Sequence, residues 1–232
     1  MKPVCAVLGV GPGNGAAFAR RFAGGGYAVA LLARSTDLTG KLASSLGDAR
    51  AYACDVTDAG SIGRAFDGIR RDLGDPEVLV YNAGSGVWGS IEQATPEEFE
   101  SAWRVNALGG YLASKQVIPA MKRTGRGSIV FVGATASRKG GARSASFSSA
   151  KGAQRSLAES MARALWPEGI HVCLIVVDGI VDLPRTRERM PDKPDSFFIK
   201  PADVAEIGFQ LSQQGRSAWS FEVEARPFAE TW

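Results

Sequence analysis

The chain has 232 residues, of which 45% are apolar and 22% are charged. This composition is typical of a globular protein and excludes disordered and fibrous classes. The formal net charge of +3 comes from basic residues spread along the chain, without a block of like charges or a stretch that interleaves basic and aromatic residues. We therefore expect no nucleic-acid partner.

Neither a membrane nor a metal partner is expected. No apolar run approaches the length of about 18 residues that a membrane helix needs, and the first run meets Gly9 too early for a secretory signal. The three cysteines, Cys5, Cys54 and Cys173, are widely spaced in apolar runs, which suits neither a disulfide framework nor a zinc site. We interpret them as buried free thiols in a reducing cytoplasm.

Short apolar runs alternate with helical spacing from the start of the chain. Residues 4–9, 27–33 and 49–56 are expected as strands, each followed by a helix, near 15–23, 38–46 and 61–73. Residues 77–84 and 127–133 continue the series of strands. Between them a helix is expected after Thr95, with Pro96 at its first position and Glu98 completing a capping box.

The second half of the chain continues the same alternation. Residues 146–166 are expected as a long helix, residues 169–177 as a strand buried on both faces, and residues 218–227 as the location of a last strand. We predict a single Rossmann-like α/β domain over residues 1–232, with about seven mainly parallel strands and helices on both faces. Residues 183–200, rich in proline and charge, are expected to be irregular and are a candidate substrate loop.

A glycine-rich loop lies between the first strand and the first helix. The segment "GVGPGNG" places glycines at 9, 11, 13 and 15. Its spacing differs from G-x-G-x-x-G, but it has the same features: a tight turn, close backbone approach and N–H groups at a helix N-terminus. The loop predicts a dinucleotide pyrophosphate site; the alternative is a strand-to-helix turn without a ligand.

The end of the second strand predicts which dinucleotide binds. NAD sites usually carry an acidic residue there, whereas this chain has Ala33, Arg34 and Ser35. A guanidinium offers several donors to a 2′-phosphate, and no carboxylate repels it. We expect NADP(H) in preference to NAD(H), unless Arg34 is only a solvated loop charge.

Several motifs occur in one order along the chain. They are Gly9, Gly13 and Gly15 in the spacing G-x3-G-x-G, Asp55 in "CDVTD", Asn82-Ala83-Gly84, Asn106 and Lys151. In order and spacing the chain resembles the short-chain dehydrogenase/reductase family over essentially its whole length. The resemblance implies an oxidoreductase that acts on a small-molecule substrate and assembles as a homodimer or homotetramer.

The resemblance also implies roles for individual residues. Asp55, with Val56 beside it, would bind the adenine, residues 82–84 would line the adenosine side, Asn106 would be the catalytic-site asparagine, and Lys151 would hold the nicotinamide ribose. The candidate cofactor-binding residues are Gly9, Gly11, Gly13, Asn14, Gly15, Arg34, Ser35, Asp55, Val56, Asn82, Ala83, Gly84, Lys151, Gly179 and Val181.

The chain departs from the family pattern at the chemical centre. Phe147 stands where the family has the tyrosine of Tyr-x-x-x-Lys, and Ala134 stands where it has the catalytic serine. The proline-glycine after the sixth strand is Asp178-Gly179, and the threonine expected four residues after that glycine is Leu183. A protein with these replacements lacks the usual proton donor, whose contribution is typically about 10²- to 10⁴-fold in rate.

Three explanations remain open. Another donor could serve, with Thr135 for orientation and a water near Lys151 as the proton source; the other hydroxyls nearby in sequence are Ser137, Ser144, Ser148 and Tyr111. Alternatively, the substrate is an iminium ion or an activated C=C bond that needs no strong acid. In the third, the protein binds NADP(H) without turnover, as a sensor or scaffold. His171 is interpreted as a surface or edge residue.

Overall fold

Seven parallel strands form the central sheet of the computed structural model, which describes residues 2–86 and 88–229. The strand order is β3-β2-β1-β4-β5-β6-β9, and all neighbours are parallel. The strands are β1 Val4–Leu8, β2 Ala28–Ala33, β3 Ala49–Ala53, β4 Pro76–Tyr81, β5 Gly127–Ala134, β6 Ile170–Val177 and β9 Glu222–Ala225. The predicted single-domain Rossmann-like fold is confirmed.

The strand order reverses at β1, which lies between β2 and β4. In doubly wound sheets a crevice forms at the carboxyl ends of the strands where the strand order reverses, and ligands bind in this crevice. The glycine-rich loop follows β1 directly, so the topology places it at this crevice.

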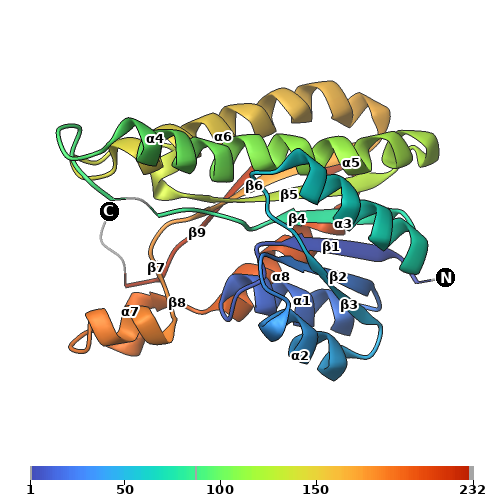
Figure 1. Ribbon diagram of the computed structural model, residues 1–232, viewed down its shortest axis with the longest axis horizontal. Coiled ribbons are helices and arrows are strands. Elements are labelled where there is room, and N and C mark those ends of the chain that lie inside the picture. Colours follow the sequence, from blue (N-terminus) through green and yellow to red (C-terminus); the bar gives the residue numbers. More distant parts are fainter. Residues whose placement is uncertain (1, 87, 230–232) are drawn as a thin grey trace.

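Helices cover both faces of the sheet. Figure 1 shows α3, α5 and α6 on one face and α1, α2 and α8 on the other. The helices are α1 Asn14–Gly24, α2 Asp37–Leu46, α3 Ala59–Asp72, α4 Pro96–Trp103, α5 Gly109–Thr124, α6 Ala145–Leu165, α7 Pro184–Arg189 and α8 Pro201–Ser212. Among the described residues, none of these helices is long and apolar enough to cross a membrane.

The core consists of two clusters, one on each face of the sheet. Alternate residues of β1 divide between them: Val4, Ala6 and Leu8 face one cluster, and Cys5 and Val7 the other. Because both faces are covered, the whole strand is buried, which explains its continuous apolar sequence.

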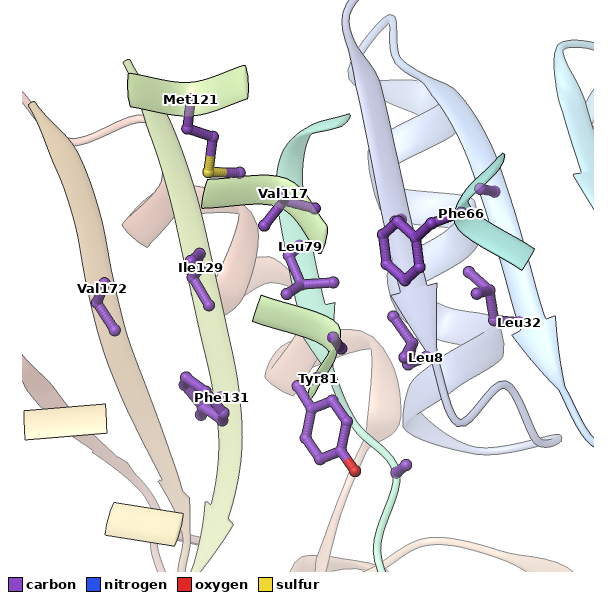
Figure 2. Close-up of a cluster of buried hydrophobic side chains, with 14 of the residues drawn as sticks. Leu8, Leu32, Phe66, Leu79, Tyr81, Val117, Met121, Ile129, Phe131 and Val172 are labelled. Atoms are coloured by element: carbon purple, nitrogen blue, oxygen red, sulfur yellow. The ribbon is translucent and has the colours of Figure 1, made fainter. Parts of the chain in front are cut away.

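Figure 2 shows the cluster beneath α3 and α5. Phe66 of α3 lies near Leu8 of β1, and Val117 of α5 lies near Leu79 of β4, all fully buried. This packing fixes the helices that precede and follow the carboxyl end of β4, where the candidate site lies.

The predicted start of α4 is confirmed. Thr95 Oγ1 accepts a hydrogen bond from the Glu98 amide at 3.2 Å, and the Glu98 carboxylate accepts one from the Thr95 amide at 3.1 Å. Pro96 is the first helical residue. The long helix expected at 146–166 is α6, Ala145–Leu165.

The prediction that residues 183–200 are irregular is wrong. The segment contains α7, a 3₁₀ turn at Asp195–Phe197 and a short strand β8, Phe198–Ile199, which pairs in parallel with β7, Ile180–Val181. Arg187 organises it, with its guanidinium bonded to the Asp182 carboxylate at 2.7 and 2.8 Å. A two-residue strand depends on this tertiary pairing, so the local sequence carries little signal for it.

The interpretation of His171 as a surface residue is also wrong. The side chain is buried, and its ring stacks on Trp219 with centroids 4.8 Å apart. Its two nitrogens lie 3.1 Å from the Leu211 carbonyl oxygen and 2.9 Å from that of Ser220. Burial lowers the pKa of His171. Trp166 packs on the ring from nearby in the sequence, but Leu211, Trp219 and Ser220 come from the distant C-terminal segment.

The three cysteines are free and buried, as predicted. Burial raises the pKa of all three thiols, that of Cys54 to about 11. The thiols are therefore protonated and inert near neutral pH.

Candidate active site

The glycine-rich loop packs closely against the end of β4. Gly9 has a φ of +80°, and a side chain there would overlap the Ala83 backbone. A Cβ at Gly15 would lie 2.6 Å from the Gly9 carbonyl oxygen, so glycine is required at both positions. Asn82 ties the two segments together, because its Nδ2 donates to the Gly9 carbonyl at 2.8 Å.

The N-terminus of α1 fits an anion. Gly13 is its N-cap and provides no side-chain cap, and the first turn carries no acidic residue. The amide groups at this helix end and the positive end of the helix dipole are thus suited to a pyrophosphate. Asn14, the first helical residue, has a buried Oδ1 that finds no hydrogen-bond partner in residues 2–86 and 88–229.

Arg34 and Asp55 follow the carboxyl ends of β2 and β3. Arg34 is exposed directly after β2, while the Ser35 hydroxyl bonds to the Asp37 carboxylate at 2.8 Å. The Asp55 carboxylate accepts hydrogen bonds from the Thr57 amide and hydroxyl at 2.9 and 2.8 Å. These bonds lower the pKa of Asp55, and the Arg34 charge adds to the effect. Asp55 is therefore ionised and fixed in position.

Asn106 lies in a π-helical segment, Arg104–Leu108, between α4 and α5. Its Nδ2 donates to the Ala102 carbonyl at 2.9 Å and to the Ser85 carbonyl at 3.3 Å. Asn106 is fully buried, and its Oδ1 has no partner among the described residues. Such π-bulges often occur at functional sites, and this one turns a polar side chain toward the loop after β4.

Lys151 lies beside Asn106 in a buried position. Its Nζ donates to the Val132 carbonyl at 2.9 Å and to Gln154 Oε1 at 3.1 Å. A Cβ at Gly84 would lie 3.4 Å from Asn106 Oδ1 and 3.7 Å from Lys151 Nζ, so the two groups approach the same point. Burial lowers the pKa of Lys151 to about 7.

Gln154 completes this network and was not predicted from the sequence. It is fully buried one turn after Lys151 on α6, and its Nε2 donates to the Asn106 backbone carbonyl at 3.0 Å. It therefore connects the lysine to the π-helical segment. A glutamine three residues after the lysine, on the same helical face, is the only signal that the sequence gives for it.

Phe147 lies one turn before Lys151, with its ring centroid 6.0 Å from Lys151 Nζ. Trp88, from the loop after β4, packs on it with ring centroids 5.2 Å apart, although 65% of Trp88 is exposed. This aromatic pair, Trp88 and Phe147, forms an apolar wall near Lys151. Trp88 was not predicted from the sequence.

Thr135 and Asp178 form a pair at the ends of β5 and β6. The Thr135 hydroxyl donates to the Asp178 carboxylate, which also pairs with Arg226 beyond β9. The Thr135 hydroxyl and the Asp178 carboxylate thus connect the ends of two neighbouring strands, β5 and β6.

The hydroxyls of Ser137, Ser144 and Ser148 bond locally. Ser137 Oγ donates to the Ala134 carbonyl at 2.6 Å, and the hydroxyls of Ser144 and Ser148 bond to each other at 2.6 Å. Tyr111 is 45% exposed on α5.

Gly179, Val181 and Leu183 lie where β7 leads into α7. Gly179 has a φ of +153° and packs against Pro227, and Val181 is partly exposed in β7. The Leu183 side chain reaches the glycine-rich loop, since a Cβ at Gly13 would lie 2.5 Å from Leu183 Cδ2. Leu183, at the start of the segment 183–200, therefore borders the glycine-rich loop.

The fold, the glycine-rich loop at the switch point and the paired asparagine and lysine define a dinucleotide-binding oxidoreductase scaffold. A family model described as short chain dehydrogenase matches residues 3–194, and the chain belongs to that family.

Three comparisons illustrate the relationship. The chain is 31% identical to the 3-oxoacyl-[acyl-carrier-protein] reductase of Bos taurus, over 81% of this chain and 79% of that one. It is 32% identical to the inactive 2-(S)-hydroxypropyl-CoM dehydrogenase 2 of Xanthobacter autotrophicus, over 80% of this chain and 87% of that one. A metagenomic short-chain oxidoreductase solved with NADP has a TM-score of 0.84 and 28% identity, covering 98% of both chains.

Proposed function

We propose that the protein is an NADP(H)-dependent oxidoreductase with a non-standard active site. Arg34 supports the 2′-phosphate, the amide groups at the start of α1 support the pyrophosphate, and Asp55 supports the adenine. The solved relative that binds NADP and the reductases among the curated relatives are consistent with this assignment. Bound NADPH would supply hydride at its nicotinamide ring.

Lys151 and Asn106 prepare the nicotinamide end of the site. The Lys151 amine is fixed by two acceptors and is suited to hold ribose hydroxyls. Asn106 offers an unpartnered Oδ1 to a donor such as a water molecule or a ribose hydroxyl. Phe147 and Ala134 then form an apolar surface that excludes water from the reacting carbon but cannot donate a proton.

The observation that carries the proposal is the intact Asn106–Gln154–Lys151 network. Its three buried polar side chains are expensive to keep in the core unless they are hydrogen-bonded, and the one open acceptor faces the site. A chain that had lost all contact with the cofactor would gain nothing from this arrangement.

The test is NADPH oxidation over a panel of carbonyl, imine and enone compounds. The wild type is compared with the double variant Ala134→Ser, Phe147→Tyr, which restores the family's hydroxyls. We expect wild-type turnover of at least one compound, and a rise of roughly 10²-fold or more in ketone reduction by the double variant. Wild-type inactivity over the whole panel, with an active double variant, would contradict the assignment.

That result would favour a second candidate, an NADP(H)-binding sensor or scaffold without turnover. Two observations support it: the hydroxyls absent at positions 134 and 147, and a relative whose name describes it as inactive. The candidate predicts NADPH binding that changes the affinity for a protein partner.

We also propose a homodimer or homotetramer. Phe99 and Trp103 on α4 and Tyr111 on α5 are each more than 40% exposed, and large apolar side chains exposed on these two consecutive helices are suited to a subunit contact. Sedimentation of the purified protein measures the oligomeric state.

The buried free thiols are compatible with the reducing cytoplasm expected from the sequence.

A further inference from the structure

The site has two properties that restrict the substrate: it has no hydroxyl at positions 134 and 147, and it has an aromatic wall. Phe147 and Ala134 carry no hydroxyl, and the Thr135 hydroxyl donates its hydrogen bond to the Asp178 carboxylate. Lys151 donates to Val132 and Gln154. Ser137, Ser144 and Ser148 use their hydroxyls in local hydrogen bonds.

Charge development distinguishes the possible substrates. Hydride addition to a ketone leaves an alkoxide, and addition to an enone leaves an enolate, so both create negative charge on oxygen. Without a donor, an apolar site disfavours that charge strongly. Hydride addition to an iminium cation does the reverse, because it removes charge and leaves a neutral amine.

The aromatic pair provides a means of binding a cation. The faces of tryptophan and phenylalanine attract cations, and tryptophan is the stronger of the two. Trp88 keeps 65% of its surface exposed although it packs against Phe147, so a ligand can cover it. The low pKa of Lys151, about 7, reduces the repulsion that a permanent ammonium would exert on a cation nearby.

We propose that the substrate is a preformed iminium ion, held against Trp88 and Phe147. This inference rests on the proposed NADP(H)-dependent function and names its substrate class. In the reaction, a C–H bond forms as hydride reaches the iminium carbon, and the C=N π pair becomes the nitrogen lone pair. The nicotinamide is oxidised, the iminium is reduced to a tertiary amine, and no proton is taken up.

The first experiment compares N-methyl-3,4-dihydroisoquinolinium, a permanent cation, with 1-tetralone, a neutral ketone of similar shape. Both are offered with NADPH to the wild type and to the double variant Ala134→Ser, Phe147→Tyr. For the wild type we expect kcat/KM for the iminium to exceed that for the ketone by at least about 100-fold, the lower range of general acid catalysis. The double variant should narrow this ratio at least about tenfold.

Deuterium labelling shows the origin of the hydrogen atom that is added to the iminium carbon. With NADPH deuterated at the transferred position, the amine should carry one deuterium on carbon, and in D₂O with ordinary NADPH it should carry none. A solvent isotope effect near one on kcat is expected because no proton moves.

A variant of Trp88 tests cation binding separately. Trp88→Leu should raise KM for the iminium by about 2- to 30-fold, the range of a cation–π contact, and leave the affinity for NADPH unchanged. Trp88→Phe should recover part of the loss. Phe228→Leu, at an aromatic side chain that is 92% exposed after β9, is the matched control and should have no effect.

Fluorescence titration with NADPH distinguishes a failure of the iminium assignment from a failure of the proposed NADP(H)-dependent function. Wild-type protein that binds NADPH but reduces the ketone as well as the iminium, or reduces neither, overturns the iminium assignment and leaves NADPH binding in place. Protein that does not bind NADPH overturns the proposed function itself.

Discussion

At the scale of single residues, two kinds of position dominate: glycines that permit close backbone contact, and buried polar side chains that form a network. The glycines at 9, 13 and 15 and the motif residues Asn82, Asn106 and Lys151 were predictable because their types and spacing are tied to a known geometry. Gln154 and Trp88 were not, since their roles depend on partners that only the folded chain brings close.

Gly9 gives a direct test of the loop geometry. Gly9→Ala should abolish NADPH binding and lower the free energy of unfolding by more than 1 kcal/mol, on the order expected for a strained left-handed residue that also collides with Ala83. Gly26, with a φ of +89° and, apart from its chain neighbours, no atom of the described residues within 4 Å of its Cβ position, is the matched control. Gly26→Ala should show the strain alone and keep NADPH binding. If both variants lost the same free energy of unfolding in urea and bound NADPH equally well, a collision of the new side chain with Ala83 would be excluded.

Lys151 predicts a pH dependence of stability. Its pKa falls from 10.5 to about 7 on burial, so between these values the unfolded state binds more protons and stability rises with pH. The free energy of unfolding of the wild type relative to Lys151→Met should therefore increase from pH 7 toward pH 10, by at most about 1.4 kcal/mol per pH unit. Urea unfolding of both proteins at several pH values measures this. A difference that is constant with pH would show that Lys151 has an ordinary pKa.

At the scale of elements, prediction succeeded where local sequence fixes the structure. The start of α4 is an example, because the capping groups of Thr95 and Glu98 are three residues apart. It failed for β7 and β8, whose two residues each form strands only by pairing with each other. The π-helical segment around Asn106 was also missed, since no spacing in the sequence distinguishes it from a regular helix.

The capping box of α4 can be tested alone. Thr95→Ala removes the acceptor for the Glu98 amide and should lower the free energy of unfolding by about 1 kcal/mol. Thr95→Ser retains the hydroxyl and should restore most of this loss. Thermal or urea unfolding of the three proteins is sufficient, and an unchanged stability of Thr95→Ala would show that the cap is dispensable.

At the scale of the whole molecule, the alternation of strands and helices was sufficient to predict the parallel sheet and the place of the cofactor loop. It did not predict how the C-terminal segment returns to the core. Trp219 and the Ser220 carbonyl cover His171, which the sequence alone presented as a polar residue at a strand start. Contacts between segments nearly 50 residues apart determine that burial.

The central claim, an NADP(H) site at the carboxyl ends of the strands, is tested most directly by cofactor titration. NADPH and NADH are titrated against the wild type, Arg34→Ala and, as a control, Arg50→Ala. Arg50 is an exposed arginine near the amino end of β3, whereas Arg34 follows the carboxyl end of β2. We expect the wild type to prefer NADPH, Arg34→Ala to lose about tenfold or more of that preference, and Arg50→Ala to retain it. An NADPH to NADH affinity ratio that Arg34→Ala leaves unchanged would contradict the account.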